Sequence, residues 1–173
     1  VIAQNRLKGV GFLSREDAIN YGVTGPSGRG SGWACDVRKR SPYAAYDKVQ
    51  FDEVLYNEGD SYARYMVRMK EIEQSLHILE QLVDNIPEGD YLAKTKPIIK
   101  VPEGRYFKEV EAARGAFGIY LESRGDKFPY RLKVNSPGFN LVGAVDHMTR
   151  GSKIADLIAI GGSLDYVVPD IDR

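Results

Sequence analysis

The stretch DSYARYMVRMKEIEQSLHILEQLVDNI, residues 60–86, decides how the rest of this sequence can fold. Its apolar side chains recur every three or four positions, which is the spacing of one helix face, at Tyr62, Met66, Met69, Ile72, Leu76, Leu79, Val83 and Ile86. Asp60 is a good N-cap, and Pro87 and Gly89 end the pattern. We therefore predict one long amphipathic helix at about 60–86. Its apolar face needs neighbours, and its solvent side is expected to carry Arg68, Lys70, Glu71, Glu73 and Glu80.

The sequence before this helix is rich in glycine and charge. Ser14 and Asp17 have the spacing of a capping box, so a short helix is expected to begin there and to end at Gly22. Residues 22–32, GVTGPSGRGSG, predict a long, tight loop. Irregular charged chain is expected at 36–43, followed by at most a short strand at Val49–Leu55.

The sequence after the helix changes its period. Residues 92–103 contain two prolines and predict a surface linker. Apolar residues then alternate with other residues at Phe117, Ile119 and Leu121, and again at Tyr130, Leu132 and Val134. This period of two predicts a β-hairpin at about 110–135. Two helices are expected at 139–148 and 152–160, so the fold class is α+β, with long helices and a hairpin.

Composition narrows the class of function. The 173 residues are 43% hydrophobic and 28% charged, which excludes disorder, and 24 basic residues balance 24 acidic ones. No nucleic-acid partner is expected, because a balanced charge gives no field that attracts a polyanion. The one cysteine, Cys35, indicates a reducing compartment, and no apolar run reaches the roughly 20 residues of a membrane span. The start at Val1 is interpreted as a cut or processed end.

Several motifs have both a functional and a structural interpretation. The glycine-rich loop and Gly151-Ser-Lys153 suggest phosphate binding but lack the full motif, so structural loops are favoured. Arg124-Gly-Asp126 spells an adhesion tripeptide and is also good turn chemistry, which is favoured. His77 and His147 have no second histidine at metal spacing, so both are interpreted as structural.

Three features that contain charged residues suggest a functional region. Arg29, inside the glycine-rich loop, can reach an internal carboxylate or a partner subunit. Glu109 and Glu111 share a strand face, where a nearby arginine could hold partly buried charges. The tail from Gly161 to Arg173 mixes apolar residues with acids, and Val167, Val168 and Ile171 predict that it is buried at a site.

Three long blocks carry a resemblance to a known family. They are residues 21–44, with YGVTGPSGRGSGWACDVRKRSPY; residues 111–124, with EAARGAFGIYLESR; and residues 130–173, ending in DYVVPDIDR. The chain resembles the C-terminal portion, over its whole 1–173 length, of the D subunit (49-kDa type) of respiratory complex I, the proton-translocating NADH:quinone oxidoreductase. That resemblance implies the fold shared with the large subunit of nickel–iron hydrogenases, with helices and a quinone-chamber tail at about 139–173.

The resemblance assigns residues to a quinone chamber. It implies that Asp165, Val167 and Arg173 contribute its wall from the tail and that Arg114 lies near the same pocket. It assigns no catalytic role to this chain, because the family's head-group residues lie in a part that the chain lacks. Val167 and Asp170 stand where hydrogenases carry two metal-binding cysteines, so no metal is expected here.

The resemblance also implies cofactors, partners and location. Quinone would be the substrate, an iron–sulfur cluster would lie in a neighbouring subunit, and NAD would bind another subunit. Expected partners are the iron–sulfur B-type, C-type and membrane-arm subunits, on the cytoplasmic side of the bacterial inner membrane. The isolated chain is expected to be inactive. An alternative is a hydrogenase-related subunit that acts as a metal-free assembly surface, with the long helix docking partners.

Overall fold

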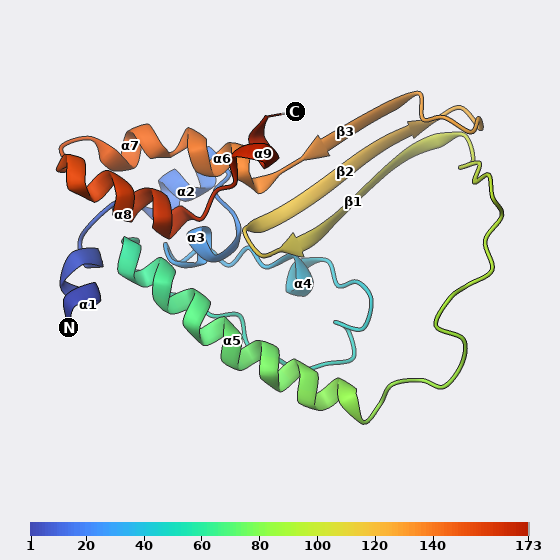
Figure 1. Ribbon diagram of the computed structural model, residues 1–173, viewed down its shortest axis with the longest axis horizontal. Helices are drawn as coiled ribbons and strands as arrows, with labels where there is room; N and C mark the ends of the chain where they lie inside the picture. The colour runs from blue at the N-terminus through green and yellow to red at the C-terminus, as the bar shows by residue number, and fades with distance from the viewer. Residues whose placement is uncertain (173) are drawn as a thin grey trace.

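A computed structural model describes residues 1–172 and shows an α+β fold. A group of helices forms one end of the molecule, and a sheet projects from it (Figure 1). The elements in chain order are α1 (Ile2–Leu7), α2 (Arg15–Tyr21), α3 (Gly25–Arg29), α4 (Val37–Arg40), α5 (Ser61–Val83), β1 (Gly104–Ala112), β2 (Gly115–Ser123), β3 (Arg131–Asn135), α6 (Pro137–Gly143), α7 (Val145–Thr149), α8 (Ile154–Leu164) and α9 (Val168–Ile171).

The helix expected at about 60–86 spans Ser61–Val83. Asp60 caps it by accepting a hydrogen bond from the Ala63 amide at 2.7 Å, which satisfies one of the free donors of the first turn. Its first two turns are buried against α8 and the chain before α2. Its later apolar residues stay 54–62% exposed in the described chain, namely Ile72, Leu76, Leu79 and Val83.

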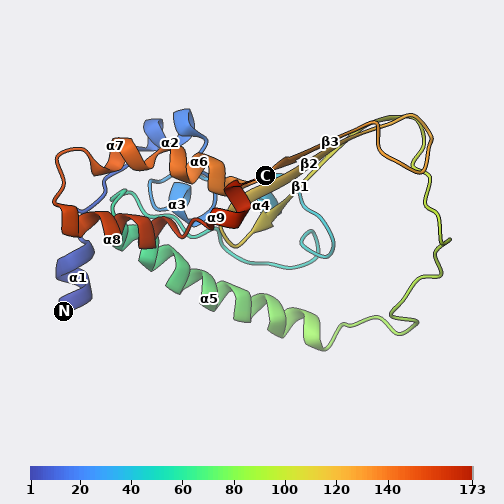
Figure 2. The same ribbon diagram turned by 45° about the horizontal axis from the view of Figure 1, so that its top comes forward.

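The main hydrophobic core joins segments from both ends of the sequence. It consists of Leu13, Ala18, Val23, Leu141, Ala144, Met148, Ile160 and Leu164. These residues come from α2, α6, α7, α8 and the chain around α2, and the two ribbon views agree that these helices lie together (Figure 2). Helices formed more than a hundred residues apart are therefore held against each other by burial of apolar surface.

The buried Arg64 side chain ties α5 to this core. Its Nε donates to Ser163 Oγ at 3.0 Å, Nη2 donates to the Gly11 carbonyl at 2.8 Å, and Nη1 donates to the Gly59 carbonyl at 3.0 Å. The side chain is fully buried, and burial lowers its pKa to about 9. Neutral oxygens from three separate parts of the chain thus surround one cation.

The sheet is antiparallel with strand order β1-β2-β3. The alternating apolar residues pair across it, as in Val110 with Phe117 and Leu121 with Leu132. The sheet is larger than the predicted hairpin, because β1 begins at Gly104 and pairs with β2 along its whole length. Residues 84–103 connect the end of α5 to the start of β1 as irregular, exposed chain (Figure 1).

At most a short strand was expected at Val49–Leu55, and this segment is irregular, because no strand of residues 1–172 pairs with it; Val49 and Phe51 instead pack on Ile78. Two other local expectations were wrong. The chain expected to be irregular at 36–43 contains α4, which Asp36 caps by accepting from the Arg38 amide at 2.9 Å. The glycine-rich loop contains α3, where proline stands in the first turn, a position that suits its fixed φ.

Candidate functional site

A pocket lies where the β1–β2 turn meets the tail. It has a volume of about 350 Å³, within the usual range for small-molecule sites. Its lining is Ala112, Ala113, Arg114, Phe117, Pro137, Val167, Pro169 and Asp170. The structure therefore brings together two of the residues that the sequence assigned to a chamber, Arg114 from the turn and Val167 from the tail.

Arg114 also contacts Asp165, the third assigned residue. Its Nε donates to the backbone carbonyl of Asp165 at 2.7 Å, and its Nη2 lies 3.5 Å from Oδ1 of the same residue. Asp165 ends α8 in the left-handed conformation, with φ of 56°, which turns its carbonyl away from the helix. The guanidinium thus holds the tail mainly through its backbone, while the two partly exposed charges interact more weakly.

The glycine-rich segment positions the turn that carries Arg114. Gly25 has φ of +69°, and a Cβ on it would lie 2.5 Å from Gly115 Cα, so only glycine allows this approach. Thr24 Oγ1 accepts a hydrogen bond from the Ala116 amide at 3.0 Å. The start of α3 is buried against this turn, which supports the structural interpretation of the glycines over phosphate binding.

The tail is less buried than the sequence predicted. Ser136 Oγ donates to Asp170 Oδ2, which fixes α9 against the start of α6. Val167 and Ile171 are half-buried, but Val168 is 65% exposed, because α9 lies at the rim of the pocket and turns this side chain outward. Arg173 lies outside the described residues, so its expected place in the chamber wall stays a prediction.

A buried cluster of charges lies behind the turn, centred on Arg29. Its Nη1 is 2.7 Å from Glu111 Oε1, its Nη2 is 2.7 Å from Glu71 Oε1, and Asp36 Oδ2 is 4.0 Å from Nη1. The prediction that Arg29 reaches an internal carboxylate is confirmed. Glu111 is the acid of the pair on β1 that enters the cluster, whereas Glu109 pairs with Arg40 at the surface.

Burial and charge act against each other in this cluster. Burial disfavours the charged form of Arg29, but the charges of Glu111 and Glu71 outweigh it, and the pKa of Arg29 is raised. Burial also opposes ionisation of Asp36, yet the hydrogen bonds and charge of Arg38 dominate and lower its pKa. Burial raises the pKa of the adjacent Cys35 thiol to about 12, so this cysteine is a neutral packing residue.

Sequence reasoning missed Glu71. It was expected on the solvent side of the long helix, but its side chain is only 18% exposed and points to Arg29. A signal was present, because Arg64, Arg68 and Glu71 are spaced by four and three residues and therefore lie along one helix face. In this helix, the charged residues at helical spacing beside the apolar stripe form a second buried face rather than a solvent-exposed one.

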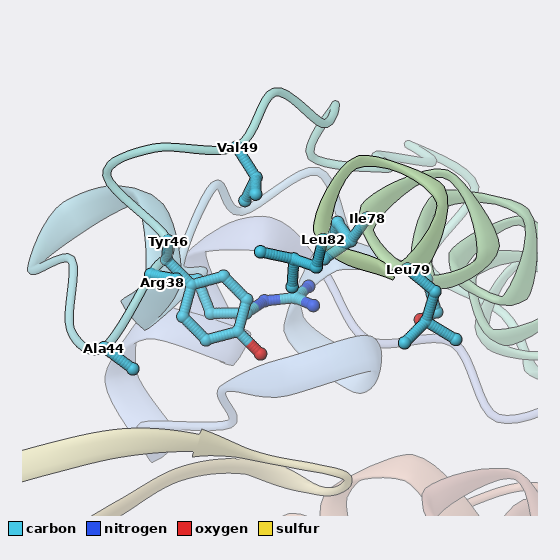
Figure 3. A pocket seen from close by; sticks show the side chains of 9 residues that line it. Arg38, Ala44, Tyr46, Val49, Ile78, Leu79 and Leu82 are labelled. Carbon is cyan, nitrogen blue, oxygen red and sulfur yellow. The ribbon is translucent and has the colours of Figure 1, made fainter. Parts of the chain in front are cut away.

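A second hollow lies between the later half of α5 and the chain at 38–49. Its volume is about 390 Å³, and its walls are mostly apolar. Figure 3 shows Arg38 beside the Tyr46 ring and Leu82. The Arg38 guanidinium lies 4.9 Å from the Phe51 ring centroid and 5.8 Å from that of Tyr46, as expected for cation–π contacts. No residue of this hollow was assigned to a site from the sequence.

The described residues offer neither a ready metal site nor a membrane span. Across residues 1–172, no group of three or more His, Cys, Asp and Glu side chains is arranged to hold a metal ion. Within the same part of the chain, no helix combines the length and the apolar character that crossing a bilayer requires.

Comparison with known proteins places the chain among the dehydrogenase subunits of respiratory chains. The family described as "Respiratory-chain NADH dehydrogenase, 49 Kd subunit" matches residues 1–100 and 94–173. The chain belongs to this family, so the resemblance inferred from its motifs is confirmed.

Curated relatives match the whole chain. It is 68% identical over 173 residues to the C/D subunit of the NADH-quinone oxidoreductase of Phocaeicola vulgatus and 69% identical to the corresponding C/D protein of Bacteroides fragilis. It is 53% identical over 174 residues to the D subunit of the NADH-quinone oxidoreductase of Desulfotalea psychrophila. All of the chain is covered in each case, but it spans only 33% of the two C/D proteins and 47% of the D protein.

Proposed function

We propose that this chain forms part of the wall of the quinone chamber of a proton-translocating NADH:quinone oxidoreductase. The observation that carries the proposal is the pocket at the base of the sheet, where Arg114 reaches Asp165 and Val167 lines the wall. The names of the relatives support the enzyme class, since each belongs to an NADH-quinone oxidoreductase.

The pocket has the chemistry that a quinone needs. Phe117, Pro137 and Val167 offer apolar surface to a ring, and the Arg114 guanidinium offers donors to a carbonyl oxygen. Reduction of a quinone adds two electrons and two protons, so negative charge develops on its oxygens before the protons arrive. A cation at this place stabilises that charge, and an ionised Asp165 responds to it through the same guanidinium.

The remaining roles belong to neighbours. We propose that NAD binds another subunit and that an iron–sulfur cluster in a neighbouring subunit delivers the electrons. The chain itself would contact the B-type, C-type and membrane-arm subunits from the cytoplasmic side of the bacterial inner membrane. The fold would be that of the hydrogenase large-subunit lineage, adapted to quinone by the residues at 165–173, where Val167 and Asp170 replace thiolates.

The test is quinone reduction by membranes whose enzyme carries Asp165→Asn or Val167→Met in this chain. We expect Asp165→Asn to lower the rate by at least about tenfold and Val167→Met to change inhibitor sensitivity, while reduction of a soluble artificial acceptor stays normal. Asp126→Asn at the exposed hairpin end is the matched control. Normal quinone rates and normal inhibitor sensitivity in a fully assembled enzyme would exclude this site assignment.

A second candidate function is favoured by the exposed stripe on α5. The later half of that helix presents Ile72, Leu76 and Leu79 to solvent, as a docking surface for another subunit would. If the chain serves only as an assembly surface of a hydrogenase-related complex, Leu76→Ser with Leu79→Ser will abolish assembly, while Asp165→Asn will leave the rate of the assembled complex unchanged. Stoichiometric nickel in the complex would also favour this candidate.

A further inference from the structure

The cluster around Arg29 holds more acid than base. Among the side chains that form its ion pairs, Arg29 and Arg38 supply two positive charges, and Asp36, Glu71 and Glu111 supply three negative charges when all are ionised. The nearest further cation is Arg68, which acts on both Glu71 and Asp165. All five side chains are at least four-fifths buried. An uncompensated buried charge is costly, so one carboxyl of such a cluster tends to carry a proton.

The three carboxylates differ in how many hydrogen bonds they accept. Glu111 accepts from Arg29 Nη1 at 2.7 Å and from the Val37 amide at 3.0 Å. Asp36 accepts from the Arg38 amide at 2.9 Å, from its Nε at 3.0 Å and from its Nη2 at 2.6 Å. Hydrogen bonds of this kind stabilise the ionised forms of both acids.

The buried Oε1 of Glu71 lacks such hydrogen bonds among residues 1–172. Its Oε1 lies 2.7 Å from Arg29 Nη2 as an ion pair, but no donor in residues 1–172 makes a well-aligned hydrogen bond to this buried oxygen. Burial raises the pKa of Glu71, and the charge of Arg29 opposes that rise without cancelling it. Glu71 is also the most exposed of the three acids, at 18%, so a proton from solvent reaches it most easily.

Arg68 connects Glu71 to the pocket. It stands three residues before Glu71 on α5, its Nη1 donates to the Arg64 carbonyl at 3.0 Å, and its Nη2 reaches the Leu164 carbonyl, next to Asp165, at 3.4 Å. Burial lowers the pKa of Arg68, and the charges of Asp165 and Glu71 both oppose that effect, while Arg114 and Arg29 reinforce it. One partly desolvated cation is therefore shared by an acid of the pocket and an acid of the cluster.

The charged groups that act on Glu71 come from α3, from the start of α4 and from α5 itself. Arg29 comes from α3, and Asp36 and Arg38 come from the start of α4. Arg68 comes from α5 itself. The cations Arg29, Arg38 and Arg68 favour its ionised form, whereas burial and Asp36 favour its protonated form.

We propose that Glu71 is an internal proton-binding site, whose affinity for a proton follows the charge at Asp165 through Arg68. The coupling to Asp165 rests on the function proposed above, whereas the proton site itself does not. When negative charge near residue 165 is reduced, Arg68 is less compensated, the potential at Glu71 becomes more positive, and Glu71 releases its proton. When that negative charge is restored, Glu71 takes a proton up.

The proton site is tested by infrared difference spectra between pH steps over about pH 5 to 9, a range in which ordinary Glu side chains are ionised at all but the acid end. The protein that carries this chain is compared with its Glu71→Gln form, and Glu73→Gln, an exposed neighbour paired with Lys70, is the control. We expect a carboxylic-acid C=O band that titrates above the ordinary Glu range, is lost in Glu71→Gln and is kept in Glu73→Gln. Persistence of the band in Glu71→Gln, or its absence from the unsubstituted protein, overturns the proposal.

A second variant guards against failure of the first to fold. Glu71→Asp keeps a carboxyl in the cluster, so we expect its band to remain but to titrate at a different pH. A band in Glu71→Asp that titrates as in the unsubstituted protein would overturn the assignment of the band to residue 71.

The coupling is tested with Asp165→Asn in the assembled enzyme. Removing the negative charge at position 165 should move the titration of the Glu71 band to lower pH, and reduction of the quinone should change the same band in the unsubstituted enzyme. An unmoved titration overturns the coupling. If Asp165→Asn moves the titration but leaves quinone reduction normal, the proton site stands and the proposed chamber fails, so the two failures are distinguishable.

Discussion

Arg29 and Arg64 are both fully buried, yet the two regions around them balance a buried cation in opposite ways. Arg29 is surrounded by three carboxylates from α5, β1 and the residue that caps α4. Arg64 is surrounded by the carbonyls of Gly11 and Gly59 and by two serine hydroxyls. The partners of Arg29 can gain and lose protons, whereas the hydrogen-bond partners of Arg64 are neutral oxygens that cannot; the charge of the nearby Asp60 also acts on Arg64.

The difference separates a responsive region from a fixed one. A buried cation among carboxylates depends on their ionisation, so its contribution to stability varies with pH. A buried cation held by neutral oxygens keeps its hydrogen bonds over the whole physiological range, and it acts as a permanent clamp. The responsive region lies directly behind the turn that carries Arg114, while the clamp joins α5 to α8.

The largest expected effect comes from Arg29→Gln, which leaves the buried carboxylates of Glu71 and Glu111 without their ion-pair partner and Asp36 with Arg38 alone. At neutral pH we expect the free energy of unfolding to fall by about 3–5 kcal/mol, measured by chemical denaturation. Arg38 contributes most to the lowered pKa of Asp36 and Arg29 adds to it, so the share that Arg29 contributes to stability exists above the ordinary Asp pKa and is lost as pH falls through the lowered value. The difference in the free energy of unfolding between Arg29→Gln and the unsubstituted protein should therefore become smaller toward acid pH. The exposed Arg150→Gln is the control, and it should leave the free energy of unfolding nearly unchanged.

A smaller loss is expected for Arg64→Gln, which removes several hydrogen bonds to buried oxygens and leaves one nearby buried carboxylate, Asp60, which still caps α5. We predict a decrease of about 2–4 kcal/mol in the free energy of unfolding. Because burial lowers the pKa of Arg64 only to about 9, its charge is constant below that pH, and the decrease should be the same over about pH 5 to 8. A strongly pH-dependent loss of stability in Arg64→Gln, or a pH-independent one in Arg29→Gln, would contradict the distinction drawn between the two regions.

The smallest expected effect is on the rate at which the Cys35 thiol is alkylated, which can be measured first in the unsubstituted protein. Cys35 lies in the Arg29 region, and burial raises the pKa of its thiol to about 12. We expect alkylation at pH 8 to be more than about a hundredfold slower than in the unfolded protein, because the thiolate is scarce and shielded. Arg29→Gln should accelerate this reaction more than Arg64→Gln does. Equal acceleration by both variants would mean that the two regions open together.

Local signals predicted several elements of the fold. The period of α5, its Asp60 cap, the Ser14 cap of α2 and the alternation in β2 and β3 are all carried by neighbouring residues, which is why they are visible in the sequence. Elements that depend on distant contacts were not visible. α3 forms among glycines because Gly25 must approach Gly115, and β1 extends to Gly104 because β2 offers a partner along its length.

The candidate site shows the same limit. Arg29 was predicted to reach an internal carboxylate or a partner subunit from its glycine-rich loop, but which carboxylate it meets depends on how α5 is rotated against β1. Glu71 was therefore assigned to the wrong side of its helix. The contact of Arg114 with Asp165 follows no local pattern at all, since it joins positions 51 residues apart. The family motifs suggested that both lie near one pocket, and only the folded structure reveals the backbone hydrogen bond.

The Arg64 clamp has a consequence for the order of folding during synthesis. Its partner Ser163 follows it by 99 residues, whereas Gly11 and Gly59 precede it. While the ribosome is still synthesising the strands of the sheet, α5 has been made but α8 has not. The Arg64 guanidinium therefore stays hydrated, and the first turns of α5 are not yet covered by α8. Docking of α8 then removes that water, and a chain truncated before residue 154 would keep the apolar core exposed to solvent, the kind of surface that chaperones and proteases recognise.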